Sequence, residues 1–178
     1  PTPSTPSSPT RVALVTGGSR GIGRATAEAL LERGFQVFFC GRSPDVLEDA
    51  QQQLFIRYPG KVFSRLCDVR SQSAVEELVA WVEQESGRLD VLVNNAGIIK
   101  DAVLVKVKDG AVVSKMSLAQ WQAVIDVNLR GVFHCSQAVA DGMVAQGSGV
   151  ILNASSVVGL YGNFGQTNYA ATKSAVIT

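Results

Sequence analysis

Short apolar runs alternate with longer stretches of helical periodicity from Arg11 to the end of the chain. The runs that predict strands lie at 12–15, 37–39, 62–66, 91–93 and 150–152. The stretches that predict helices lie at 22–33, from Ser43-Pro44 onward, at 71–85, at 118–145 and at 167–178. Continuous apolar runs such as the one at 12–15 are typical of strands that are buried on both faces. This alternation predicts an α/β fold with a doubly wound parallel sheet of about five strands.

The composition argues against several classes of protein. The chain has 178 residues, 46% hydrophobic and 17% charged, which indicates one domain with an apolar core. Its net charge of +1 argues against binding to nucleic acid or to an anionic membrane surface. No apolar run approaches the roughly 18 residues that span a bilayer, and no secretory signal is visible. We therefore expect a cytoplasmic protein.

The cysteines support the same expectation. Cys40, Cys67 and Cys135 are odd in number, far apart and without a CxxC pattern or a histidine cluster. This spacing argues against a disulfide framework and against a zinc site. We expect three free thiols and no bound metal.

The amino-terminal residues differ from the rest of the chain in composition. Four of the six prolines fall within the first nine positions, among serines and threonines. Such a segment cannot bury apolar surface, so we predict a disordered tail at 1–10. A single domain is expected over 11–178.

A glycine-rich segment joins the first predicted strand to the first predicted helix. It reads Thr-Gly-Gly-Ser-Arg-Gly-Ile-Gly over 16–23. Gly17, Gly21 and Gly23 allow a sharp turn and a close approach of the backbone to a phosphate, and the helix N-terminus offers free N–H groups to a pyrophosphate. A tight turn without a ligand is the alternative for such a motif alone. Its position between a buried strand and a helix favours a dinucleotide site.

The end of the second strand bears on the choice of dinucleotide. In a dinucleotide-binding fold an acidic residue at this place binds the ribose 2′-hydroxyl. This chain has Arg42 there, and Arg20 lies in the glycine-rich segment. Two guanidinium groups suit a 2′-phosphate, which predicts NADP(H). Two solvated surface arginines are the alternative.

Two further groups of polar residues follow strands. Asn94-Asn95-Ala96-Gly97 comes after the fourth strand and could line a ligand crevice or form an ordinary turn. Ser155-Ser156 follows the fifth strand, and Tyr169 and Lys173 stand four residues apart on the last helix. That spacing places both on one helix face, where an ammonium favours the phenolate and prepares a tyrosine for proton transfer. A purely structural pair is the alternative.

Together these residues resemble the short-chain dehydrogenase/reductases, in particular the 3-oxoacyl-acyl-carrier-protein reductases. The resemblance covers 11–178 and rests, in chain order, on the glycine-rich segment, Asn94 to Gly97, Asp126-Val127-Asn128, Ser156, Tyr169 and Lys173. It implies a Rossmann-type fold and an NADP(H)-dependent reductase of a 3-oxoacyl thioester. A carbonyl or alcohol reductase for small or cyclic ketones and a non-catalytic cofactor-binding relative are the alternatives.

The resemblance also implies roles for individual residues. Tyr169 protonates the substrate carbonyl oxygen as hydride arrives, and Lys173 holds the nicotinamide ribose. Ser156 binds the carbonyl and is preferred to Ser155 for its separation from the tyrosine. Asn128 supports a water relay from Lys173. The residues implied in cofactor binding are Gly17, Ser19, Arg20, Gly21, Ile22, Gly23, Arg42, Asp68, Val69, Asn95, Ala96, Gly97, Tyr169 and Lys173.

Assembly is also implied by the resemblance. The helix that begins at Leu118 and the helix that carries Tyr169 form the usual subunit contact, so a homodimer or homotetramer is expected. The apolar candidates to be covered by the core or by a partner are Val132, Phe133, Val139 and Val144. His134, the only histidine, matches no role in the family and is expected to be a packed or surface residue.

The chain departs from the family in length. It ends one turn after Lys173, whereas the family continues with two further strands, a segment that covers the substrate and a Pro-Gly loop at the nicotinamide. We expect a fragment of a longer protein; a genuinely short relative is the alternative. The strand at 150–152 is then expected to be an exposed edge.

A second departure lies between Asp101 and Met116, a stretch longer than the family pattern. Valines alternate on either side of Asp109-Gly110, which predicts a hairpin of 103–107 and 111–115 beside the substrate entrance. Its three lysines, Lys106, Lys108 and Lys115, could attract an anionic phosphopantetheine-linked substrate. A mobile surface loop is the alternative.

Overall fold

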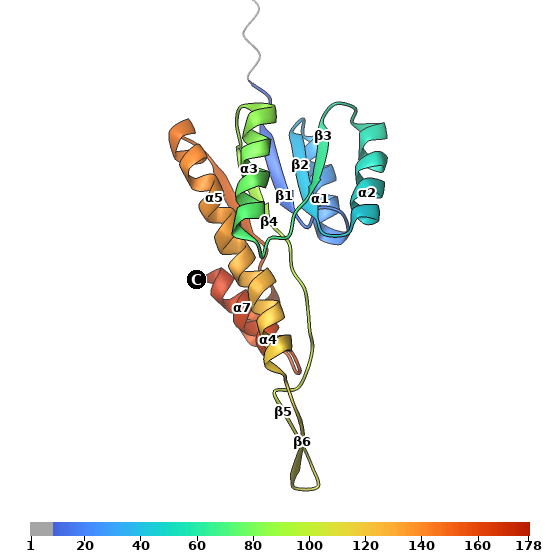
Figure 1. The fold of residues 1–178 in the computed structure, drawn as a ribbon, viewed down its shortest axis with the longest axis vertical. Coiled ribbons are helices and arrows are strands. Elements are labelled where there is room, and N and C mark those ends of the chain that lie inside the picture. Colours follow the sequence, from blue (N-terminus) through green and yellow to red (C-terminus); the bar gives the residue numbers. More distant parts are fainter. Residues whose placement is uncertain (1–8) are drawn as a thin grey trace, which may run out of the picture.

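A five-stranded parallel sheet forms the centre of the computed structural model, which describes residues 9–178 (Figure 1). The strands are β1 (Val12–Thr16), β2 (Gln36–Gly41), β3 (Val62–Leu66), β4 (Val91–Asn94) and β7 (Val150–Asn153), in the order β3-β2-β1-β4-β7. All four neighbouring pairs are parallel. The doubly wound Rossmann-type fold predicted from the sequence is confirmed. The predicted tail falls on residues 1–8, outside the described part, and on residues 9 and 10, which are exposed and irregular.

Helices cover both faces of this sheet. They are α1 (Gly21–Glu32) and α2 (Pro44–Arg57) on one face, and α3 (Gln72–Ser86) and α5 (Gly131–Gln146) on the other. Successive residues of β1 alternate between the faces, so that Ala13 and Val15 pack towards α1 and α2 while Val12 and Leu14 pack towards α3 and α5. Both faces of the strand are therefore buried, as the continuous apolar run predicted.

The long helix expected at 118–145 is interrupted. α4 (Leu118–Ile125) leads into one π-helical turn, η1 (Asp126–Arg130), and the helix resumes as α5. Such turns add one residue and are frequent at functional sites. The turn coincides with hydrogen bonds between Asn128 and the backbone of Ile98, a long-range contact of which local periodicity carries no sign. The turn places Asn128 in the interior, where its side chain is fully buried.

The last part of the chain packs beside α4. A short helix that the sequence analysis did not predict, α6 (Val157–Tyr161), precedes the predicted α7 (Thr167–Ile177). β7 pairs with β4 only and lies at the edge of the sheet, with all four of its residues exposed. The expectation of an uncovered apolar edge strand is thus confirmed.

The segment after β4 forms the predicted hairpin. β5 (Val105–Lys108) and β6 (Ala111–Lys115) pair antiparallel, two residues later at the start of the first strand than expected. Asp109 and Gly110 form the two-residue turn with φ of 51° and 78°, the positive values that a type I′ turn requires. The hairpin is a separate two-stranded sheet that projects from the body of the molecule below α4 (Figure 1).

Several smaller expectations can be compared with the structure. Val139 belongs to the core, whereas Phe133 and Val144 are exposed on α5. His134 is packed, with Nδ1 3.0 Å from the carbonyl oxygen of Val69. The three cysteines are free and buried. The helix predicted from Ser43-Pro44 onward has Ser43 at its N-cap position, but the Ser43 side chain accepts no hydrogen bond from the described helix. None of the helices within residues 9–178 has both the length and the apolar character needed to cross a membrane.

Candidate active site and dinucleotide cradle

The carboxyl ends of β1 and β4 are locked together by Thr16 and Asn95. The hydroxyl oxygen of Thr16 accepts hydrogen bonds from the backbone N–H groups of Asn95 and Ala96, each at 3.0 Å. The Asn95 amide donates to the carbonyl oxygens of Thr16 and Gly17 at 3.0 and 3.2 Å. The two motifs that the sequence analysis treated separately are therefore one structural unit at the edge of the sheet where ligands of open α/β folds bind.

Gly17, Gly18 and Gly23 of this unit leave no room for a side chain. A Cβ atom on Gly23 would lie 2.3 Å from the carbonyl oxygen of Gly17 and 2.4 Å from the Asn95 amide nitrogen. Gly17 itself has φ of 65°, a value that side-chain-bearing residues rarely adopt. The backbone of the turn can thus pass close to the N-terminus of α1, as a bound pyrophosphate requires.

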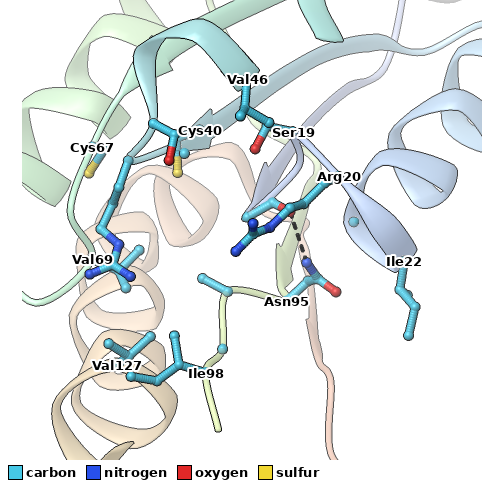
Figure 2. A pocket seen from close by; sticks show the side chains of 17 residues that line it. Ser19, Arg20, Ile22, Cys40, Val46, Cys67, Val69, Asn95, Ile98 and Val127 are labelled. Carbon is cyan, nitrogen blue, oxygen red and sulfur yellow. Dashed lines mark hydrogen bonds between the residues drawn. The ribbon is translucent and has the colours of Figure 1, made fainter. Parts of the chain in front are cut away.

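The N-terminus of α1 is open to an anion. No side chain among residues 9–178 caps its first turn, and that turn contains no acidic residue. The unpaired N–H groups of a helix start, together with its dipole, favour a phosphate. Arg20 stands at the N-cap, and its side chain extends into the middle of the adjoining cavity (Figure 2). These residues fit the pyrophosphate of a dinucleotide.

A cavity of about 300 Å³ lies against this cradle. Ten of the residues predicted to bind a cofactor line it: Gly17, Ser19, Arg20, Ile22, Gly23, Arg42, Val69, Asn95, Ala96 and Gly97. The other four, Gly21, Asp68, Tyr169 and Lys173, lie outside this lining. Seven lining residues were not predicted from the sequence, namely Cys40, Gly41, Ser43, Val46, Cys67, Ile98 and Val127. Most of these residues stand next to a predicted residue along the chain, and this adjacency is the one sequence signal that could have indicated them.

Asp68 is paired with an arginine beside the cavity. Its carboxylate accepts two-pronged hydrogen bonds from Arg70, and the Nη1 atom of Arg42 lies 4.0 Å from Oδ2 of Asp68. The hydrogen bond from the Arg70 side chain is the main reason why the pKa of Asp68 lies below its ordinary value. Asp68 therefore stays ionised to a lower pH than an ordinary aspartate, and its negative charge lies beside Arg42.

A second cavity, of about 760 Å³, continues from the first. The residues that line both are Arg20, Ile22, Arg42, Asn95, Gly97 and Ile98. Tyr169 and Lys173 of α7 line the second cavity, with Nζ of Lys173 5.7 Å from the centre of the Tyr169 ring. Nζ donates to the carbonyl oxygen of Ala154 at 2.5 Å, and burial lowers the pKa of Lys173 from its ordinary value. The phenol and the ammonium thus share one space with the dinucleotide cradle.

The two candidate serines have different hydrogen bonds. Ser155 donates its hydroxyl proton to the carbonyl oxygen of Lys173 at 2.7 Å. Ser156 is the N-cap of α6, and its Oγ accepts from the backbone N–H of Val158 at 3.2 Å. Ser155 lines the second cavity, whereas the predicted Ser156 is half-buried and belongs to the lining of neither cavity. Of these two serines, Ser156 is the one whose hydroxyl proton makes no hydrogen bond to another described residue, so it can be donated to a ligand.

Asn128 lies behind the cavities and outside their lining. Its Oδ1 accepts from the N–H of Ile98 at 2.8 Å, and its Nδ2 donates to the carbonyl oxygen of Ile98 at 3.0 Å. The π-helical turn therefore anchors Ile98, which lines both cavities. Asn168, which the sequence analysis did not single out, is also fully buried and donates to the carbonyl oxygen of Lys100 at 3.0 Å. Its place directly before Tyr169 was the only available signal.

Almost the whole chain matches one known protein family. The sequence profile described as short chain dehydrogenase matches residues 11–178. The chain belongs to the short-chain dehydrogenase family. The matched range includes the glycine turn, Asn95, Tyr169 and Lys173.

Individual proteins of known name or structure are also similar to this chain. The chain is 44% identical over 167 residues to the 3-oxoacyl-acyl-carrier-protein reductase FabG of Thermotoga maritima, covering 94% of this chain and 64% of that protein. A 3-oxoacyl-acyl-carrier-protein reductase of Synechocystis is 43% identical over 167 residues, with the same two shares. The crystal structure of gox2181 matches with a TM-score of 0.85 and 34% identity, covering 95% of this chain and 63% of that one. The chain therefore spans slightly less than two thirds of the length of these relatives.

Proposed function

We propose that the protein is a reductase that converts a 3-oxoacyl thioester to the 3-hydroxyacyl thioester with NADPH. The observation that carries this proposal is the shared space: the cavity that holds Tyr169 and Lys173 opens directly into the dinucleotide cradle. A substrate carbonyl at Tyr169 therefore lies next to the place where a nicotinamide fits. The relatives named 3-oxoacyl-acyl-carrier-protein reductases support the choice of a thioester.

The proposed cofactor follows from charge at the rim of the first cavity. Arg20 and Arg42 both line it, and Arg42 is exposed at the end of β2. Two guanidinium groups at this place suit a 2′-phosphate through charge-assisted hydrogen bonds. Bound NADPH supplies the hydride, and the uncapped start of α1 holds its pyrophosphate.

The residues of the second cavity divide the remaining work. Tyr169 gives its phenolic proton to the carbonyl oxygen of the substrate as that oxygen becomes an alkoxide. Lys173 places a positive charge beside the phenol and so favours the phenolate that remains. Ser156 donates its free hydroxyl proton to the same carbonyl oxygen. Asn128 keeps the Ile98 segment in position and supports proton supply towards Lys173.

The cofactor proposal predicts a change in preference for an Arg42→Asp variant. The affinity for NADPH should fall by 1–3 kcal/mol, about 5- to 150-fold, because a charge-assisted hydrogen bond is lost. The affinity for NADH should change little, since it has no 2′-phosphate. Fluorescence titration of both dinucleotides measures this. Arg33→Asp, which alters an exposed arginine at the far end of α1, serves as the control. Equal NADPH affinity in wild type and Arg42→Asp would refute the assignment.

The proposed reaction is tested by comparing the two serines in the full-length protein. NADPH oxidation with a 3-oxoacyl thioester should show kcat reduced about 10²-fold by Ser156→Ala, the usual cost of removing one donor to a developing oxyanion. Ser155→Ala should reduce kcat much less, because its proton already binds the Lys173 carbonyl. Its main effect should be a loss of about 1 kcal/mol of stability. A wild-type enzyme that oxidises no NADPH with any 3-oxoacyl thioester would overturn the function.

Assembly and location belong to the same proposal. Phe133 and Val144 of α5 are 59% and 79% exposed, which supports a homodimer or homotetramer that covers them. The three cysteines are free and buried, which supports a cytoplasmic location.

A further inference from the structure

The two faces of the β5–β6 hairpin differ in polarity. Side chains that pair across an antiparallel ladder lie on the same face. Lys106 and Lys108 stand two residues apart in β5 and therefore lie on one face, where they pair with Ser114 and Ala111. The register of the ladder shifts between Lys106 and Val107, which places one extra residue on the β6 side. On the opposite face Val107 pairs with Val112, and Val105 with Lys115 near the base. The three lysines expected to act together are thus divided, with two on the polar face of the hairpin.

The root of the hairpin is attached to the start of α7. The N–H of Ala102 donates to the carbonyl oxygen of Gly165 at 2.8 Å, and the side-chain amide of Gln166 donates to the carboxylate of Asp101 at 3.1 Å. Three residues later α7 presents Tyr169 to the second cavity. The hairpin therefore rises from the mouth of the candidate active site.

The β5–β6 hairpin extends well beyond the mouth of the second cavity. Four residues of β5 at a rise of about 3.3 Å each give a reach of about 13 Å. Every residue of both strands is exposed, including Val107 and Val112 at 60% and 55%. An isolated two-stranded hairpin is marginal in water, so this one is expected to gain stability from a partner.

The net charge of the hairpin indicates what kind of partner surface is complementary to it. Residues 105–115 carry three lysines and one aspartate, a net charge of +2, whereas the whole chain has a net charge of only +1. The rest of the molecule therefore has a net charge of −1, and the hairpin is a segment of net positive charge that projects from it. A second copy that met this hairpin with its own hairpin would bring an equal positive charge to the contact. An acidic surface is the complementary partner.

We propose that the Lys106–Lys108 face of this hairpin is the docking site for an acidic protein that carries the acyl thioester on a phosphopantetheine arm. This inference rests on the proposed function, because it supplies the carrier for that reaction. A carrier that holds its thioester at the end of a long arm must bind some distance from Tyr169. The hairpin offers a positive contact at that distance and is anchored next to the tyrosine.

The test compares a charge-reversed hairpin with a matched control in the full-length protein. The variant is Lys106→Glu with Lys108→Glu. The control is Arg33→Glu with Lys61→Glu, two exposed residues just before β2 and β3, at the opposite end of the sheet. Both variants change the net charge equally. The probes are fluorescent acyl carrier protein bearing an acetoacetyl thioester, and acetoacetyl-N-acetylcysteamine as a small thioester.

The hairpin variant should raise Kd and KM for the carrier about tenfold at low salt, with kcat unchanged. KM for the small thioester should stay within twofold of wild type, and the control variant should behave as wild type. The difference should shrink as salt rises, because exposed charges are screened. This pattern supports docking at the hairpin.

Other outcomes overturn the inference. Unchanged carrier affinity in the hairpin variant would refute the docking site while leaving the reductase function intact. An equal rise in KM for both thioesters would show that the hairpin acts on the active site itself. A changed sedimentation coefficient would show that the hairpin contacts a second copy instead. If the wild-type protein reduces neither thioester, the proposed function fails. The docking site is still tested in that case, because the Kd for the carrier is measured separately, from the fluorescence anisotropy of the labelled carrier protein.

Discussion

Replacing Tyr169 with phenylalanine is expected to lower kcat for ketone reduction by about 10²- to 10⁴-fold, the contribution typical of a positioned general acid. The phenolic proton acts on the carbonyl oxygen only as negative charge develops there, so its loss falls on the transition state. Tyr169 lines the second cavity and not the dinucleotide cradle. NADPH affinity measured by titration should therefore stay within about threefold of wild type, a change below 1 kcal/mol.

A neighbouring tyrosine provides the control for this measurement. Tyr161 ends α6 and is 83% exposed, so Tyr161→Phe removes the same hydroxyl group from the surface. It should leave kcat at the wild-type value. Near-normal turnover in Tyr169→Phe would contradict the proposed proton donor, and a large loss of NADPH affinity would move Tyr169 into cofactor binding.

Replacing Gly23 with alanine is expected to have the largest effect on the cradle. The new Cβ would meet the carbonyl oxygen of Gly17 at 2.3 Å and the Asn95 amide at 2.4 Å. Both contacts involve groups fixed by the lock between β1 and β4, so relief requires backbone movement. We expect a loss of about 3 kcal/mol in unfolding free energy, at the upper end of overpacking effects, and NADPH affinity below detection.

Gly34→Ala is the matched control for that variant. Gly34 follows α1 at φ of 84°, and no atom of the described chain lies within 4 Å of its added Cβ. The substitution should cost about 1–2 kcal/mol through backbone strain alone, with NADPH affinity unchanged. Chemical denaturation and dinucleotide titration measure both quantities. Wild-type NADPH binding by Gly23→Ala would show that the turn does not need its close approach.

The sequence alone determined most of the fold, because its signals are local. Continuous apolar runs at 12–15 and 91–93 mark strands that are buried on both faces, and Asp109-Gly110 specifies a two-residue turn with positive φ. The spacing of Tyr169 and Lys173 fixes both on one face of α7 by helix geometry. Chemistry that depends on neighbours along the chain can be predicted from the chain.

Only the tertiary structure decided how distant residues act on one another. The π-helical turn exists where Asn128 pairs with the backbone of Ile98, thirty positions earlier in the chain. The hydroxyl group of Ser155 donates a hydrogen bond to the carbonyl oxygen of Lys173, and this bond distinguishes Ser155 from the adjacent Ser156. The division of the hairpin lysines depends on the register across the ladder, and the hairpin's link to α7 depends on contacts with Gly165 and Gln166. These outcomes arise from hydrogen bonds between segments that only folding brings together, and local periodicity carries no record of them.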